Sequence, residues 1–179
     1  MRAPVVLLTI ALAPAAAVAG PEKVELPADW KTRFVVYNEV ERPDRAPNQV
    51  RFMYVNPEAA ASARAGAPAP AGTILVMEDR IAAAGPDGKF LRDRNGRLVP
   101  TDRVAAVAVM EKRPGWGSEY PAALRNGEWE YASYAPDGSK RAGVNTQPCL
   151  QCHTSRRSPD RDYTFTFMQW VADGKPGPR

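Results

Sequence analysis

The residues with the clearest chemical potential lie in one run, Cys149-Leu150-Gln151-Cys152-His153. Two cysteines three positions apart, with a histidine directly after the second, are typical of a c-type haem attachment site. Each thiol forms a thioether bond to the haem, and the histidine imidazole binds the iron from the proximal side. We therefore expect one covalent haem c per chain, attached through Cys149 and Cys152, with His153 as the iron ligand.

Other uses of a Cys-x-x-Cys pair fit this sequence less well. A structural zinc site needs four cysteine or histidine ligands, whereas the chain has 2 cysteines and 1 histidine. A thioredoxin-like dithiol is expected near a βαβ pattern, but this pair follows a series of apparent strands near the C-terminus. Because both cysteines lie in the motif, none remains for a structural disulfide once haem is attached.

The single histidine also limits the sixth coordination position of the iron, because the chain has no second imidazole. A methionine in that position would give an electron carrier with a closed, low-spin iron. An open position would instead favour the binding of a small ligand. Four methionines in apolar runs are candidates for the sixth ligand, although such residues also fill cores: Met53, Met77, Met110 and Met168.

Residues 1–19 are expected to form a secretory signal peptide. Arg2 supplies the positive start, residues 5–13 are apolar, and Ala17-Val18-Ala19 gives the small-residue pattern before cleavage. The apolar run is too short to span a bilayer, and no later run is apolar enough. Export agrees with c-type haem, whose thioether bonds form outside the bacterial cytoplasm, so we expect a periplasmic protein.

Removal of these 19 residues leaves 160 of the 179, enough for one domain. We assign the haem domain to residues 20–173 and a disordered tail to residues 174–179. The net charge of +4 becomes +3 without Arg2, and no basic stripe with interleaved aromatics suggests nucleic-acid binding. A basic segment surrounds the haem motif, where it can contact the haem propionates, attract an acidic redox partner or simply face solvent: Lys140, Arg141, Arg156, Arg157 and Arg161.

The residues before the motif indicate a sheet that positions it. Asn56 and Pro57 predict a helix start that continues to residue 65, and the haem motif itself is expected on a short helix or turn. Residues 73–78 are almost continuously apolar, which predicts a central strand. Strand patterns occur at residues 34–40, 50–55, 73–78, 104–110, 128–134 and 163–167, the last closing the sheet. The predicted fold class is therefore α+β, a mainly antiparallel sheet with one or two short helices and a C-terminal haem attachment motif.

This arrangement resembles the cytochrome P-460 family, which is related to the β-type cytochromes c′. The stretches that carry the resemblance span nearly the whole mature chain: residues 34–37 and 40–44, 54–59, 72–78, 109–117, 127–131, 149–153 and 162–165. The resemblance implies a five-coordinate haem with His153 proximal and an open distal face lined by strand residues. Nitric oxide is then the first ligand to expect.

The same family includes enzymes that oxidise hydroxylamine, so oxidation of hydroxylamine or nitric oxide is an alternative function. These enzymes carry a lysine cross-link to the haem ring. The matching position falls near Met77, and residues 73–79 contain no lysine. The resemblance therefore favours ligand binding over oxidation.

An oxidising site also needs a proton acceptor near the iron. Glu78 and Glu111 each end an apolar strand, so each is a candidate if it points into the haem pocket. The other interpretation places both carboxylates in water or in ion pairs with Arg80, Lys112 or Arg113. Both a protein redox partner and a homodimer are compatible with the sequence.

Overall fold

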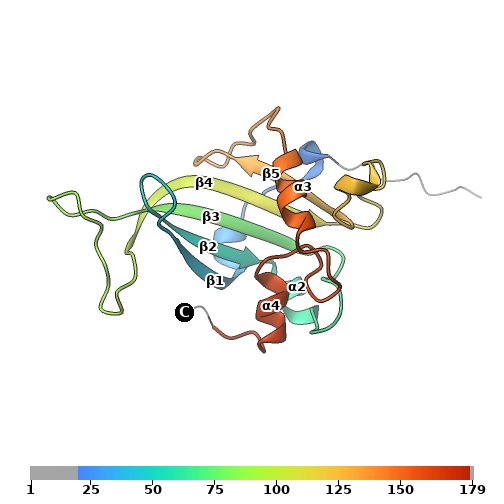
Figure 1. Cartoon of the computed structure of the whole chain (residues 1–179), viewed down its shortest axis with the longest axis horizontal. Helices are drawn as coiled ribbons and strands as arrows, with labels where there is room; N and C mark the ends of the chain where they lie inside the picture. Colours follow the sequence, from blue (N-terminus) through green and yellow to red (C-terminus); the bar gives the residue numbers. More distant parts are fainter. Residues whose placement is uncertain (1–19, 178–179) are drawn as a thin grey trace, which may run out of the picture.

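Five antiparallel strands form one sheet in the order β1-β2-β3-β4-β5, so every strand pairs with its neighbours in the sequence (Figure 1). The computed structural model describes residues 20–177, and the expected signal peptide lies outside the described residues. The strands are β1 (Val35–Arg42), β2 (Gln49–Val55), β3 (Ile74–Ala82), β4 (Pro100–Lys112) and β5 (Trp129–Tyr134). The predicted antiparallel α+β fold is confirmed, and β3 is the central strand.

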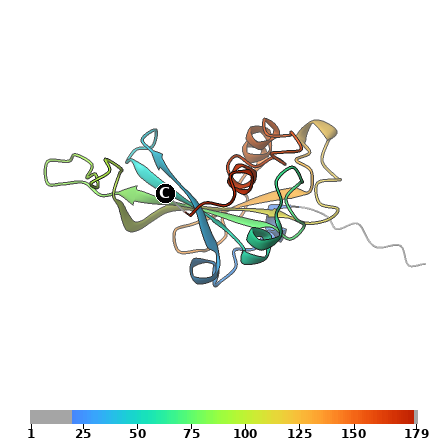
Figure 2. The same cartoon turned by 90° about the horizontal axis from the view of Figure 1, so that it is seen from below.

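The helices are short and cover both faces of the sheet. They are η1 (Pro21–Lys23), α1 (Trp30–Arg33), α2 (Pro57–Ser62), η2 (Ala122–Leu124), α3 (Gln147–Thr154) and α4 (Phe167–Ala172). Figure 2 shows α3 and α4 on one face and α1 on the other. No helix in residues 20–177 is long and apolar enough to cross a membrane.

Two buried clusters hold the layers together, because successive strand residues point to opposite faces of the sheet. On the α3 and α4 face, Leu75 and Tyr131 pack with Leu150 and Phe167. On the α1 face, Val76 packs with Trp30 and other buried side chains. The neighbours Leu75 and Val76 thus belong to different layers, and burial on both faces explains the continuous apolar pattern of β3.

The prediction of a last strand over residues 163–167 is wrong. Asp162 and Tyr163 have φ values of 44° and 61°, in the left-handed region, and α4 begins at Phe167. The Thr164 backbone N–H donates to the carbonyl of Arg161, and its hydroxyl accepts a hydrogen bond from the Met168 backbone N–H. These local bonds compete with strand pairing, so the sheet ends at β5.

The helix predicted over residues 57–65 is shorter than expected and ends at Ser62. The Asn56 side chain does not cap it. Its Oδ1 instead accepts a hydrogen bond from the Ile74 backbone N–H at 2.8 Å, and its Nδ2 donates to the Gly72 carbonyl. Asn56 therefore ties the end of β2 to the start of β3.

Two segments outside the sheet are tied back to it. Residues 83–99 connect β3 to β4 and form a hairpin excursion that projects beyond the end of the sheet (Figure 1). In this excursion the Leu98 backbone N–H donates to Glu41 Oε1 at 2.6 Å. Residues 174–177, assigned above to the tail, contact the domain. Trp170 Nε1 donates to the Pro176 carbonyl at 2.7 Å, and Lys175 Nζ donates to the Ala60 carbonyl. Residues 178–179 lie outside the described part of the chain.

Candidate haem site

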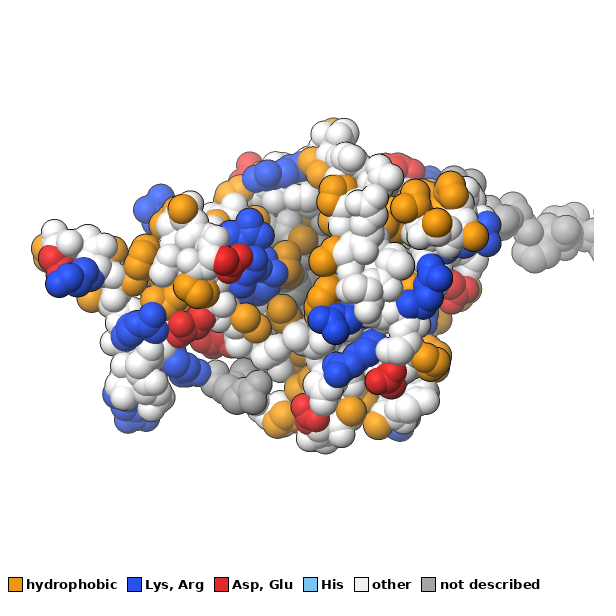
Figure 3. All heavy atoms as spheres, in the orientation of Figure 1, with side chains coloured by type: hydrophobic (Ala, Val, Ile, Leu, Met, Phe, Trp, Pro, Cys, Tyr) orange, Lys and Arg blue, Asp and Glu red, His pale blue; other side chains and the backbone are white. Residues whose placement is uncertain are grey.

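A cavity of about 600 Å³ lies between the sheet and the Cys-x-x-Cys-His segment. Cys149, Cys152 and His153 line it on one side. Strand residues line it on the other, among them Met53, Leu75, Met77, Ala108, Met110 and Tyr131. Figure 3 shows a hollow near the middle of this face, bordered on one side by Lys and Arg side chains.

Helix α3 presents both thiols to this cavity. Pro148 lies in its first turn, where the missing N–H costs no helical hydrogen bond. Residues three positions apart share a helix face, so Cys149 and Cys152 lie together, both exposed and free. Leu150 points the other way and is buried in the core. The spacing of the motif thus separates the two thiols, which face the cavity, from Leu150, which anchors the helix.

Asn126 fixes α3 to the sheet. The residue is 1% exposed, and its Nδ2 donates hydrogen bonds of 2.9 Å to the Leu150 carbonyl and the Tyr131 hydroxyl. Its Oδ1 accepts a hydrogen bond of 2.8 Å from Thr154 Oγ1. The buried amide is therefore well satisfied, as such groups must be. In the sequence an Asn-Gly pair signals only a turn.

His153 is held with one nitrogen available for a metal. Its Nδ1 lies 2.6 Å from the Tyr163 carbonyl oxygen. A carbonyl only accepts hydrogen bonds, so Nδ1 carries the proton and Nε2 has a free lone pair. Tyr131 and Phe165 hold the ring between them, with centroid distances of 4.9 and 5.0 Å. Burial lowers the pKa of His153, which favours the neutral imidazole that binds metals.

The cations that line the cavity are not those of the basic segment noted in the sequence. They are Arg45 and Arg51, which sequence analysis missed. Arg51 makes a two-point ion pair with Asp79, with N–O distances of 2.7 and 2.8 Å. Its only sequence signal is an arginine inside an otherwise apolar strand. In the basic segment, Lys140 instead binds Glu25 at 3.0 Å and none of the five cations lines the cavity.

The structure does not bring Glu78 and Glu111 to the cavity. Glu78 is fully buried on the α1 face, where it pairs with Lys31 at 2.8 Å and Arg80 at 2.7 Å. Glu111 pairs with Arg113 at 2.6 Å. Both acids alternate with residues that line the cavity, Met77 before Glu78 and Met110 before Glu111. Neither candidate carboxylate lines the cavity, and both are in ion pairs.

Three of the four candidate methionine ligands line the cavity, namely Met53, Met77 and Met110. Met168 is buried in the core and does not line it. The Met53 sulfur accepts a hydrogen bond from Thr166 Oγ1 at 3.0 Å. Met77 and Met110 are therefore the methionines with cavity access and no such bond among the described contacts.

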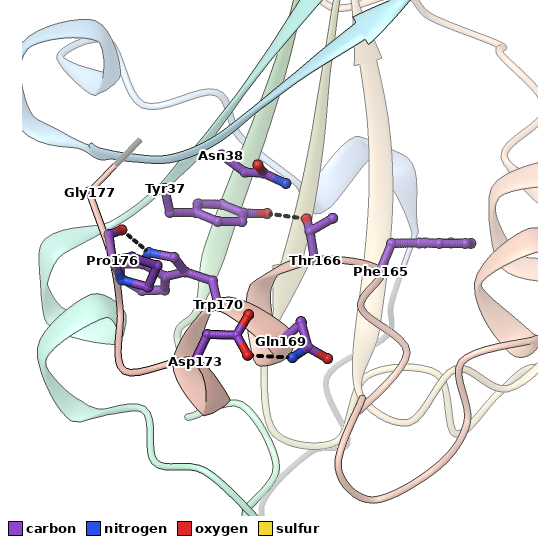
Figure 4. A pocket seen from close by; sticks show the side chains of 9 residues that line it. All are labelled: Tyr37, Asn38, Phe165, Thr166, Gln169, Trp170, Asp173, Pro176 and Gly177. Carbon is purple, nitrogen blue, oxygen red and sulfur yellow. Dashed lines mark hydrogen bonds between the residues drawn. The ribbon is translucent and has the colours of Figure 1, made fainter. Parts of the chain in front are cut away.

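A second, smaller cavity of about 230 Å³ adjoins the first and shares Tyr37, Phe165 and Thr166 with it (Figure 4). Burial raises the pKa of Tyr37 to about 12, so its phenol stays protonated at neutral pH. The Thr166 hydroxyl gives its hydrogen to Met53. The Tyr37 hydroxyl, 3.4 Å from Thr166 Oγ1, is therefore the donor of that pair. These two consecutive hydrogen bonds, from Tyr37 to Thr166 and from Thr166 to Met53, hold the Met53 sulfur in place.

The lining fits a haem. Two exposed thiols and a neutral imidazole occupy one wall, as attachment and iron ligation require. In the described part of the chain, Val144 and Phe165 are two of only four large hydrophobic side chains that are exposed, and both line this cavity. An apolar ring would cover both, and its carboxylates would meet the cations of the lining, Arg45 and the Asp79-paired Arg51.

Comparison with known proteins agrees with this chemistry. The family model described as Cytochrome P460 matches residues 27–166, a segment that includes all five strands and α3. A comparison with curated proteins finds no match. With most of the chain covered, and with a haem-sized apolar cavity beside His153, the protein belongs to the cytochrome P460 family and is a haem protein.

Proposed function

We propose that this protein is a periplasmic c-type cytochrome with one covalent haem, whose iron binds a small uncharged ligand, nitric oxide first. The observation that carries the proposal is the orientation of His153. Its Nδ1–H is committed to the Tyr163 carbonyl, and its ring lines the same cavity as the Cys149 and Cys152 thiols. An imidazole fixed in this way binds iron through Nε2.

The residues of the chain have separate roles in this proposal. Cys149 and Cys152 attach the haem, His153 holds its iron from the proximal side, and Arg45 and Arg51 offset the charge of its carboxylates. When bound, the haem supplies an iron that takes up small ligands and exchanges electrons. The cavity otherwise offers mostly apolar strand side chains and no carboxylate among its lining residues. Such a lining favours an uncharged ligand over a charged one.

Two features support ligand binding over oxidation of hydroxylamine. Met77, near the position that the resemblance assigns to the cross-linking lysine, lines the cavity, and no lysine is among the lining residues. Glu78 and Glu111, the candidate proton acceptors, lie in ion pairs and are not among the lining residues. An oxidase of this design would lack both its cross-link and its acid.

The test is the spectrum of the full chain expressed in a bacterium that matures c-type haem. We expect covalent haem, a broad high-spin ferrous spectrum and a clear spectral change when nitric oxide is added. Sharp low-spin bands that resist nitric oxide would instead identify an electron carrier with a methionine ligand. Consumption of hydroxylamine with an added electron acceptor would identify the oxidase. Recovery in the periplasmic fraction, with a mature mass beginning at Gly20 plus one haem, tests the location.

A further inference from the structure

The loop that supplies the Tyr163 carbonyl has an unusual backbone. Asp162 and Tyr163 are consecutive non-glycine residues with φ values of 44° and 61°. Side chains disfavour this region, and such conformations persist only where surrounding contacts fix them, often at functional sites. The residues that hold this loop therefore determine where the carbonyl partner of His153 lies.

A buried ion pair between Lys112 and Asp162 fixes one side of the loop. The two residues are 7% and 8% exposed, and Lys112 Nζ lies 2.8 Å from Asp162 Oδ2. Ala69 completes the contact, because its backbone N–H donates to Asp162 Oδ2 at 3.0 Å and its carbonyl accepts from Lys112 Nζ at 2.9 Å. The end of β4 and the segment after α2 thus meet on one carboxylate oxygen.

The other side of the loop is fixed by close packing and backbone bonds. The Tyr163 backbone N–H donates to the Arg156 carbonyl at 2.7 Å, and the Asp162 N–H donates to the Ser158 carbonyl at 2.8 Å. The Tyr163 ring covers Gly127, where an added Cβ would lie 3.1 Å from the ring. With these contacts made, the Tyr163 carbonyl points to His153 Nδ1 at 2.6 Å.

We propose that Lys112 and Asp162 are positioning residues for the proximal histidine, an inference that rests on the haem ligation proposed above. Neither residue lines the cavity, so both act through the Tyr163 carbonyl. A short, aligned Nδ1–H···O bond gives Nε2 greater electron density and makes it a stronger iron ligand. The ion pair thereby sets the strength of the iron–histidine bond and the balance between ferric and ferrous haem.

The test compares Asp162→Asn with the parent protein, both loaded with haem. Asparagine keeps the shape and a carbonyl oxygen for the Ala69 N–H but loses the charge that pairs with Lys112. We expect the iron–histidine stretching frequency of the ferrous protein, measured by resonance Raman, to fall. The reduction potential is expected to become more positive, because a weaker donor stabilises ferric iron less. Lys112→Arg, which keeps the cation, should remain close to the parent on both measurements.

Glu41→Gln is the matched control. Glu41 also accepts a hydrogen bond from a backbone N–H, that of Leu98, and pairs with a cation, Arg92 at 3.4 Å, but it does so at the hairpin excursion away from the cavity. We expect it to lower the melting temperature without moving either haem measurement. If Asp162→Asn changes only the melting temperature in the same way, the pair is merely structural and the inference is overturned.

Lys112→Gln provides an independent variant in case Asp162→Asn folds poorly. It removes the cation of the pair and leaves the Ala69 N–H bond to Asp162 Oδ2 in place, and it should move both haem measurements in the same direction. Unchanged values in the loaded Lys112→Gln protein contradict the inference. The two proposals fail differently. Parent protein without covalent, histidine-ligated haem overturns the proposed function, whereas fully loaded parent with insensitive variants overturns only the positioning role.

Discussion

Met77 and Glu78 are neighbours on β3, yet they lie on opposite faces of the sheet. Met77 lines the haem cavity, while Glu78 is fully buried against Tyr54, Lys31 and Arg80 on the α1 face. Strand alternation points the side chains of these two successive residues to opposite faces of the sheet. The register places the methionine there, and the acid then serves the stability of the opposite layer.

Glu78→Gln should therefore weaken the fold and leave ligand binding intact. Loss of the buried charge that pairs with Lys31 and Arg80 is expected to lower the free energy of unfolding by about 1–3 kcal/mol. The nitric oxide affinity of the haem-loaded variant should equal that of the parent. Chemical denaturation and a ligand titration check the two expectations. A large drop in nitric oxide affinity with unchanged stability would instead show that Glu78 takes part in ligand binding.

Cys149→Ala and Cys152→Ala should each leave one thioether bond, and the double variant should carry no covalent haem. The reason is that both thiols line the cavity from the same face of α3. Mass spectrometry of the denatured protein and the pyridine haemochrome spectrum count the bonds. Normal covalent loading of the double variant would contradict the attachment site.

Met77→Leu and Met110→Leu should leave the ferrous spectrum broad and high-spin, because we propose that neither methionine sulfur binds the iron. Both substitutions keep the volume and apolar character of the side chain, so each should cost less than about 1.5 kcal/mol of stability. Sharp low-spin bands in the parent that become high-spin in one of these variants would show that this methionine is the sixth iron ligand of the parent protein.

Arg51→Gln should make the reduction potential more negative. It removes a cation from the cavity lining and leaves the Asp79 carboxylate without its two-point partner. Less positive charge near the haem stabilises its ferric form. Arg80→Gln is the control, because Arg80 pairs with Glu78 on the opposite face. Equal shifts of the reduction potential in both variants would mean that Arg51 does not lie closer to the haem than Arg80 does.

Glu130 should make the stability of the protein depend on pH. Burial raises the pKa of this carboxyl group, which is fully buried and accepts hydrogen bonds from the Tyr120 hydroxyl and the Tyr131 backbone N–H. The folded protein then holds the proton to higher pH than the unfolded chain. The free energy of unfolding therefore falls as the pH rises from the ordinary carboxyl range through the folded-state pKa.

Glu130→Gln removes this loss, because the amide stays neutral at every pH. Melting temperatures measured from pH 4 to pH 8 should show an advantage of the variant that grows with pH. Parallel curves for parent and variant would contradict the assignment. Asp93→Asn serves as a comparison, since hydrogen bonds from backbone N–H groups lower the pKa of this half-buried loop carboxyl. The melting temperature of Asp93→Asn should show no advantage over the parent that grows with pH.

The sequence by itself predicted the haem attachment motif and determined the class of fold. Cys149, Cys152 and His153 are close along the chain, so their spacing alone predicts that one short helix or turn carries them. Strand alternation is equally local, and five of the six expected strands are present. The sixth, residues 163–167, was mispredicted because its strand-like pattern is overridden by local hydrogen bonds of Thr164.

Only the tertiary structure decided what surrounds the motif. The face on which Glu78 and Glu111 lie depends on strand register, and a shift of one residue would exchange them with Met77 and Met110. The hydrogen bonds from Lys112 and Ala69 to Asp162 join residues 50 and 93 positions apart. No local pattern encodes such contacts, because they exist only when distant segments are packed together. The sequence thus indicates a haem, and the packing determines which side chains surround the motif.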